Sequence, residues 1–176
     1  MNSLIKFSSV LVVTAAATLS ACGVSDSMST TAVGQDAING LDVNDDKADS
    51  MKQPTSKGAI AVDAPVDGSF TTHTAFHAYT YAFTGATGTL QLDATGVANA
   101  DTAIIAYKKI SNRWSLIDFN DDCTDATLNS CLTIPVTTGN YRFVVTTYGA
   151  LNGHYHPASY DLALTCADGD CEAPKL

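Results

Sequence analysis

Apolar and polar residues alternate along the second half of the chain with the period of β-strands. In residues 88–94 (GTLQLDA), Leu90 and Leu92 alternate with polar neighbours. Side chains of a strand point to its two faces in turn, so this pattern predicts a half-buried strand. The aromatic run at residues 75–83 (AFHAYTYAF) splits in the same way: Phe76, Ala78, Thr80 and Ala82 lie on one face, and His77, Tyr79, Tyr81 and Phe83 on the other.

Five further apolar, β-branched and aromatic runs follow at close spacing. They are divided by clusters rich in Gly, Asn, Asp and Pro, and no helical period separates them. Such spacing is typical of an all-β antiparallel β-sandwich. Residues 59–166, about 108 in number, are enough for one such domain and its core. The five runs are residues 102–110, 113–119, 131–136, 140–148 and 159–166.

The segment before this domain has a different composition. Residues 23–58 contain no aromatic residue and are rich in Ser, Thr, Gly and Asp. A stretch of this kind buries too little apolar surface to offset its ordering entropy. Residues 22–58 are therefore predicted to be a disordered tether with a root-mean-square span of about 30–36 Å. A short helix at residues 32–41 is the alternative for part of it, and residues 167–176 form a short C-terminal tail.

The chain begins with a basic residue and a short apolar run. Lys6 precedes the mostly apolar residues 10–19, which are fewer than the about 20 needed to span a bilayer. Residues 1–21 therefore read as a signal peptide. The run ends in Leu19-Ser20-Ala21-Cys22, which resembles the lipobox of bacterial lipoproteins. An ordinary secretory signal with a chance cysteine is the alternative.

The lipobox resemblance implies a membrane anchor. In that family the cysteine thiol, here Cys22, is alkylated with diacylglycerol and becomes the first residue of the mature protein. Acyl chains such as palmitate contribute about 0.8 kcal/mol per buried methylene, so three chains anchor permanently. The residue after the cysteine is Gly23 rather than aspartate, which favours the outer membrane. The expected location is the bacterial cell envelope, at the outer membrane or cell surface.

The charge balance limits the partners. The chain has 9 basic and 18 acidic residues. Without residues 1–21 it loses only Lys6, which leaves 8 basic residues against 18 acidic ones and a net charge of −10. A chain this poor in Lys and Arg has no electrostatic footprint for nucleic acid. Its composition also predicts no basic patch for anionic headgroups, so the membrane is expected as a partner only through the lipid.

Residues 71–166 resemble a known family, the bacterial pre-peptidase C-terminal domain. The matching segments are AYTYAF, TGTLQLDAT, ADTAIIAY, the NDD turn, TTGNYRFVVTTYG and SYDLALTC. The resemblance implies a jelly-roll-like β-sandwich. Domains of this family are commonly attached to exported enzymes, help to bind substrate surfaces or keep precursors soluble, and in some members bind calcium.

One turn carries oxygen ligands suited to calcium. The spacing of Asp118, Asn120 and Asp122 matches the first three ligands of an EF-hand, but the sixth position is Cys123 and the twelfth is Asn129. An EF-hand needs Gly and a bidentate acid there, so that motif is rejected. A looser calcium site remains as a candidate. The preferred alternative is that these side chains cap the turn by hydrogen bonds to the backbone. The candidate calcium ligands are Asp118, Asn120, Asp121 and Asp122, with Asp125 beside them.

Four cysteines remain besides Cys22. An even number in an exported protein predicts two disulfides, and three pairings are open. We favour Cys123–Cys131 and Cys166–Cys171, because each closes a short polar loop and stabilises by about 2–3 kcal/mol. A zinc site of four thiolates fits neither the compartment nor the spacing.

The histidines form two pairs. His73 and His77 lie on one face of the same run, and His154 and His156 are two residues apart. Together they would offer four imidazoles to zinc or copper. The preferred alternative places His73 in a polar lead-in and the second pair in a solvated loop.

The sequence contains no recognisable catalytic motif. It has no HExxH helix, no Gly-x-Ser-x-Gly elbow and no Gly-rich phosphate loop. We therefore expect no enzyme, but a lipid-anchored envelope protein that displays a non-catalytic binding or accessory module for a protein or polysaccharide. Tyr148, Tyr155 and Trp114 are candidate stacking residues. An atypical secreted hydrolase and a purely structural envelope lipoprotein are the alternatives.

Overall fold

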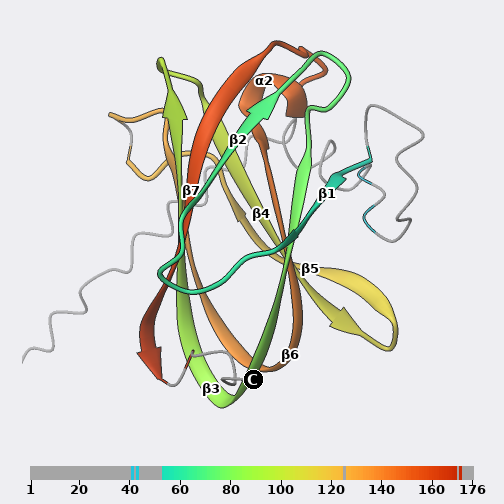
Figure 1. Cartoon of the computed structure of the whole chain (residues 1–176), viewed down its shortest axis with the longest axis vertical. Helices are drawn as coiled ribbons and strands as arrows, with labels where there is room; N and C mark the ends of the chain where they lie inside the picture. Colours follow the sequence, from blue (N-terminus) through green and yellow to red (C-terminus); the bar gives the residue numbers. More distant parts are fainter. Residues whose placement is uncertain (1–40, 42, 44–52, 125, 170, 172–176) are drawn as a thin grey trace, which may run out of the picture.

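The computed structural model describes residues 41, 43, 53–124, 126–169 and 171 (Figure 1). The predicted signal peptide, the lipobox with Cys22 and most of the predicted tether lie outside the described residues. Among the residues that are described, no helix has the length and apolar character needed to cross a membrane.

The described chain forms one curled β-sheet of seven strands, with one short helix. The strand order is β2-β7-β3-β6-β4-β5, and β1 pairs with β3 in parallel while every other pair is antiparallel. The predicted all-β antiparallel fold class is therefore confirmed. The elements are β1 (Thr55–Ala59), β2 (Val66–Phe70), β3 (His77–Val97), β4 (Thr102–Ile110), β5 (Arg113–Asn120), β6 (Ser130–Thr147), α2 (Tyr148–Leu151) and β7 (Ala158–Gly169).

Two long strands produce the curl. β3 has 21 residues and β6 has 18, and they pair from His77 opposite Val145 to Ala94 opposite Ser130 (Figure 1). The sequence pattern predicts two strands in place of each, because Gly and Thr interrupt the apolar runs. In the structure the ladder passes through with one register shift between Phe83 and Thr87. The glycines here mark close backbone approach instead of a turn, since a Cβ on Gly88 would lie 3.1 Å from the carbonyl oxygen of Asp168.

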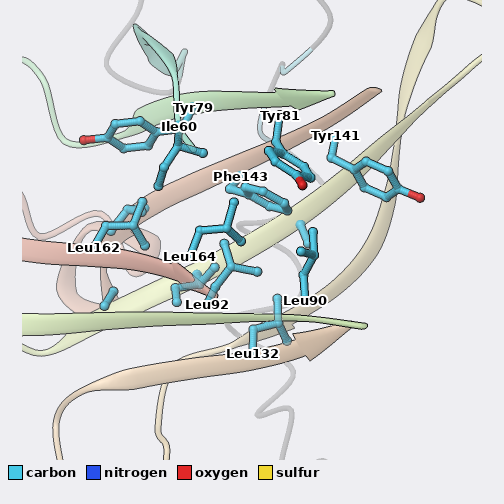
Figure 2. Close-up of a cluster of buried hydrophobic side chains, with 14 of the residues drawn as sticks. Ile60, Tyr79, Tyr81, Leu90, Leu92, Leu132, Tyr141, Phe143, Leu162 and Leu164 are labelled. Carbon is cyan, nitrogen blue, oxygen red and sulfur yellow. The ribbon is translucent and has the colours of Figure 1, made fainter. Parts of the chain in front are cut away.

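The inner core lies inside the curl. Alternate residues of β3, β4, β6 and β7 meet there, as the period-two pattern predicts (Figure 2). Leu90 and Leu92 are both fully buried, as are Leu164, which lies opposite Leu92, and Leu162, which lies opposite Ala94. Burial of such aliphatic side chains stabilises by about 1.5–3 kcal/mol each.

A second cluster, the outer cluster, covers the opposite face of β4 and β6. It consists of Leu41, Val43, Ala75, Phe76, Ala78, Ala103, Ile105, Tyr107, Val144, Ala150 and Leu151. β4 is thus buried on both faces, with Ile104 on the inner side and Ile105 on the outer side. This explains why its sequence is a continuous apolar run instead of an alternating one.

The folded body begins earlier than the sequence predicts. The expected boundary between tether and domain at residue 59 falls inside β1, whose first residue is Thr55. Leu41 and Val43 are 8% and 3% exposed, and the carbonyl oxygen of Val43 accepts a 2.5 Å hydrogen bond from Nη1 of Arg142. These residues of the predicted tether are therefore part of the packed body.

Two disulfides close short loops. Cys123 is joined to Cys131 and Cys166 to Cys171, with Cα–Cα distances of 4.9 and 5.6 Å. These are the pairings that the sequence favours. Cys171 is only 1% exposed and its carbonyl oxygen accepts a hydrogen bond from the Tyr81 hydroxyl. The first part of the predicted tail therefore belongs to the folded body, because β7 runs on to Gly169 and Cys171 joins the inner core.

Candidate functional site

A pocket of about 630 Å³ opens at one end of the sandwich that the curled sheet forms by folding over the inner core. Three segments that are distant in sequence form it: the end of β2, the turn from β3 to β4, and the stretch from the end of β6 through α2 to the start of β7. Its volume falls within the range of ligand pockets in proteins. The lining residues are Ser69, Phe70, Val97, Ala98, Ala100, Asp101, Thr147, Gly149, His154, His156, Pro157, Ala158 and Ser159.

The pocket has an apolar wall and a polar rim. Val97 and Ala98 belong to the apolar part, and Val97 is 49% exposed. On the polar side, the hydroxyl oxygens of Ser69 and Ser159 lie 2.9 Å apart. Apolar walls with a few placed polar groups are the usual construction of a site that binds a neutral organic ligand.

Asp101 gives the pocket its negative character. Burial, together with the charges of Asp122 and Asp121, raises the pKa of this carboxyl to about 6. Burial is also the main cause that raises the pKa of Asp121. Three carboxylates therefore share one region, and among the described residues no cation forms an ion pair with them. A ligand that brings a positive charge would lower the energy of this arrangement, whereas an anionic ligand would raise it.

The floor of the pocket rests on a buried polar network. Phe70 lines the pocket, and its ring stacks on Tyr160 with a centroid distance of 4.6 Å. The Tyr160 hydroxyl lies 2.7 Å from Nδ1 of His77 and 2.7 Å from the Tyr79 hydroxyl. Burial, with the nearby charge of Lys57, lowers the pKa of His77 to about 4, so this imidazole is neutral at pH 7. The hydrogen bonds of this network fix Tyr160, and the stacked Tyr160 ring in turn holds Phe70 in place.

The structure separates the four histidines. His77 is 2% exposed and hydrogen-bonded in the core, while His73 is exposed before β3. Only His154 and His156 reach the pocket. Among the described residues, the one group of three metal-ligating side chains is Asp93 with Cys123 and Cys131, and those two sulfurs form a disulfide. The four-imidazole metal site is therefore not formed.

The predicted calcium turn begins at the end of β5. The carboxylate of Asp118 accepts a 2.9 Å hydrogen bond from the Phe119 amide, as the capping alternative expects. The charges of Asp121 and Asp122 contribute to the raised pKa of Asp101, but neither residue lines the pocket. Asn120 has a buried Oδ1 without a hydrogen-bond partner in the described structure. Asp125 lies outside the described residues. Calcium binding here stays a prediction.

The candidate stacking aromatics are all partly buried. Trp114 and Tyr155 pack against the outer cluster, and Tyr148 is the first residue of α2. None of the three lines the pocket. They act chiefly as packing residues rather than as an open platform.

Sequence reasoning missed the main polar residue of the site. Asp101 stands in a short turn, TGVANAD, which has the composition of any loop. Its pKa is raised by burial and by the charges of Asp122 and Asp121, which are about twenty residues away in sequence. A residue whose pKa is shifted inside a cleft is a functional-site candidate, and that signal exists only in three dimensions.

Comparison with known proteins assigns this chain to no family. No family model matches the sequence, and no curated protein matches it. Several solved structures are similar in shape. A pre-peptidase C-terminal domain of a collagenase from Bacillus anthracis has a TM-score of 0.49 at 12% identity, covering 64% of this chain and 96% of its own.

Two further similar structures are the periplasmic inhibitor of g-type lysozyme PliG from Aeromonas hydrophila and the surface-associated copper-binding protein CorA from Methylomicrobium album BG8. Each has a TM-score of 0.42, at 16% and 10% identity. Each aligns with 64% of this chain, and the shares of their own chains are 99% and 98%. The first structure belongs to the family that the sequence resembles. At these scores we rest no function on the likeness.

Proposed function

We propose that this chain is a lipid-anchored protein of the bacterial cell envelope that displays a non-catalytic binding module. The pocket at the end of the sandwich is its ligand site. The ligand is a segment of an envelope polysaccharide or protein that carries no negative charge. The observation that carries the proposal is the position of Asp101, a partly buried carboxylate beside the apolar wall of a pocket large enough for a ligand.

The chemistry of the pocket favours binding over bond cleavage. Its hydroxyls and imidazoles can donate to and accept from sugar hydroxyls or peptide groups. In the described structure, neither His154 nor His156 makes a side-chain hydrogen bond to a hydroxyl or a carboxylate, so no activated nucleophile is assembled there. The anchor at Cys22, proposed from the lipobox, would keep such a module at the outer membrane.

One observation favours the alternative of an atypical hydrolase. A carboxyl with its pKa raised to about 6 has the property of a general acid near neutral pH. The test of the proposal must therefore follow cleavage as well as binding.

The test uses the chain from Gly23 onwards, which contains every described residue. It is incubated with peptidoglycan sacculi, chitin, chitosan and alginate, and both the bound protein and the released fragments are measured. We expect capture by a neutral or amine-bearing polymer, little capture by anionic alginate, and no fragments. Release of fragments that stops in Asp101→Asn would favour the hydrolase, and capture by none of the four polymers would contradict the proposal.

A pair of matched variants locates the site. Ala98→Trp places an indole at the pocket, on a residue that is exposed. Ala167→Trp places the same group on an exposed residue near the other end of β7. The first substitution should reduce capture about tenfold, and the second should leave it unchanged. Equal effects of the two would contradict a pocket-based interaction.

A further inference from the structure

Basic and apolar side chains gather on the hairpin of β4 and β5. Residues 108–117 (KKISNRWSLI) contain three of the chain's nine basic residues and no acidic one. The same segment holds three of the five large hydrophobic side chains that are exposed among the described residues: Ile110 at 54%, Leu116 at 41% and Ile117 at 37%. The hairpin therefore differs in charge from the rest of an acidic chain.

The tip of this hairpin extends past the neighbouring strand. β4 pairs with β6 as far as Lys108 opposite Tyr141, and beyond that point the described ladder continues only between β4 and β5 (Figure 1, lower right). Ser111 and Asn112 have φ values of 48° and 67°. Two central residues with positive φ form the tight turn that suits the twist of a two-stranded ribbon. The tip is a narrow two-stranded ribbon.

The base of the ribbon is held firmly. The Trp114 ring contacts two cations, with the guanidinium carbon of Arg142 at 4.5 Å and Nζ of Lys109 at 5.7 Å from its centroid. Trp114 also packs against the outer cluster. The register places Lys109 opposite Trp114 and Ile110 opposite Arg113, so neighbouring pairs face opposite sides. Lys109, Ile110 and Arg113 are all exposed.

We propose that the β4–β5 hairpin docks on an anionic lipid bilayer. Ile110 and Leu116 would enter the interface between headgroups and acyl chains, and Lys109 and Arg113 would contact lipid phosphates. The register places Ile110 and Leu116 on opposite faces of this basic hairpin. Such an arrangement suits a bilayer, which surrounds the hairpin, better than a protein partner, which covers one face. The composition of the whole chain predicts no basic patch, but three of its nine basic residues lie in this one hairpin.

The proposed anchor places the hairpin within reach of a bilayer. From Cys22 to Leu41 the chain can span at most about 65 Å, even fully extended. No hairpin residue lines the pocket. The membrane contact is therefore independent of the pocket's ligand.

The experiment is sedimentation of the chain from Gly23 onwards with vesicles. Vesicles of phosphatidylcholine are compared with vesicles that also contain phosphatidylglycerol. We expect binding only to the second kind, weakened by salt, and about tenfold or more weaker in the variant Lys109→Glu/Arg113→Glu. Ile110→Ser should weaken binding further at high salt. Lys57→Glu, which reverses an exposed charge on β1, is the control and should bind like the unchanged chain.

Three results would overturn the proposal. They are equal binding to both kinds of vesicle, unchanged binding by the double variant, and binding to soluble polyglutamate without binding to either vesicle. The last result would indicate an acidic protein partner in place of lipid. Thermal unfolding of each variant checks that the fold is kept. If the double variant is unfolded, the single Ile110→Ser variant is used to test the proposal.

Discussion

The Nδ1 atom of His77 lies 2.7 Å from the hydroxyl oxygen of Tyr160, inside the curl of the sheet. Tyr160 is fully buried, and its ring stacks on that of Phe70, which lines the pocket. The hydrogen bond therefore links the core of the sandwich to the wall of its candidate binding site. Burial also lowers the pKa of His77 to about 4 and raises that of Tyr160 above its ordinary value.

The first prediction concerns the stability of His77 in acid. The unfolded chain binds a proton at about pH 6.5, whereas folded His77 binds one only near pH 4. The unfolded state thus holds more protons between these values, and stability falls as the pH falls through that window. His77→Gln should remove this dependence, which amounts to at most about 3 kcal/mol. Urea unfolding at pH 7, 5.5 and 4.5 measures it.

The control is the exposed His73. His73→Gln should follow the unchanged protein at each pH. If His77→Gln shows the same loss of stability between pH 6.5 and pH 4 as the unchanged protein, the buried network is not responsible for that loss.

Asp101 is predicted to act in the opposite direction. Its folded pKa of about 6 exceeds the ordinary value of 3.8, so the folded state holds more protons between pH 4 and pH 6. Stability should therefore decrease as the pH rises through this window. Asp101→Asn should make the protein more stable at pH 7, by about 1 kcal/mol once solvent screening of this half-exposed group is counted.

Asp161→Asn is the matched control, because Asp161 is exposed on β7. It should leave the free energy of unfolding at pH 7 within about 0.5 kcal/mol of the unchanged value. A loss of stability in Asp101→Asn at pH 7 would mean that the carboxylate is held by favourable contacts, against its proposed role as an unpaired group that awaits a ligand.

Val43 tests where the folded body begins. Val43→Ser replaces a side chain that is 3% exposed and should lower the free energy of unfolding by about 1–2 kcal/mol. Leu128→Ser removes a larger side chain that is 47% exposed and should cost less. Equal, negligible costs would place Val43 in a tether, as the sequence alone suggests.

The disulfides should differ in their effect. Cys166→Ser/Cys171→Ser opens a short loop and also places a polar hydroxyl at a position that is 1% exposed in the inner core. We expect a loss of about 3–4 kcal/mol. Cys123→Ser/Cys131→Ser opens a loop outside that core and should cost about 2–3 kcal/mol. Urea unfolding of both variants gives the comparison, and a larger loss in the second pair would contradict it.

Much of the fold can be predicted from the sequence, because successive side chains of a strand point to opposite faces and the apolar ones are buried. The alternation at Leu90 and Leu92 predicts the inner face of a strand, and the short spacing of the cysteines predicts which of them pair. The continuity of β3 cannot be predicted, because the sequence alone does not distinguish a glycine that permits close packing of the backbone from one that permits a turn. Leu41 and Val43 are isolated apolar residues whose burial depends on a groove built by distant strands.

The site is harder to predict than the fold. Its lining comes from three separate segments, and none of them contains a motif. The raised pKa of Asp101 depends on its burial and on the charges of Asp122 and Asp121, which are distant in sequence. The acidic turn was visible as a cluster of ligand atoms, but its relation to a pocket arises only when β3, β4 and β5 lie together.

The most direct test of the pocket as a non-catalytic binding site is a titration followed by nuclear magnetic resonance. The isotope-labelled chain from Gly23 onwards is titrated with soluble chitosan oligomers, as an amine-bearing probe of the polymer class proposed. We predict amide shift changes confined to the lining segments around Asp101 and His156, with oligomer signals that show no cleavage. Shift changes centred elsewhere on the sandwich, no shift changes at all, or the growth of product signals would contradict the account.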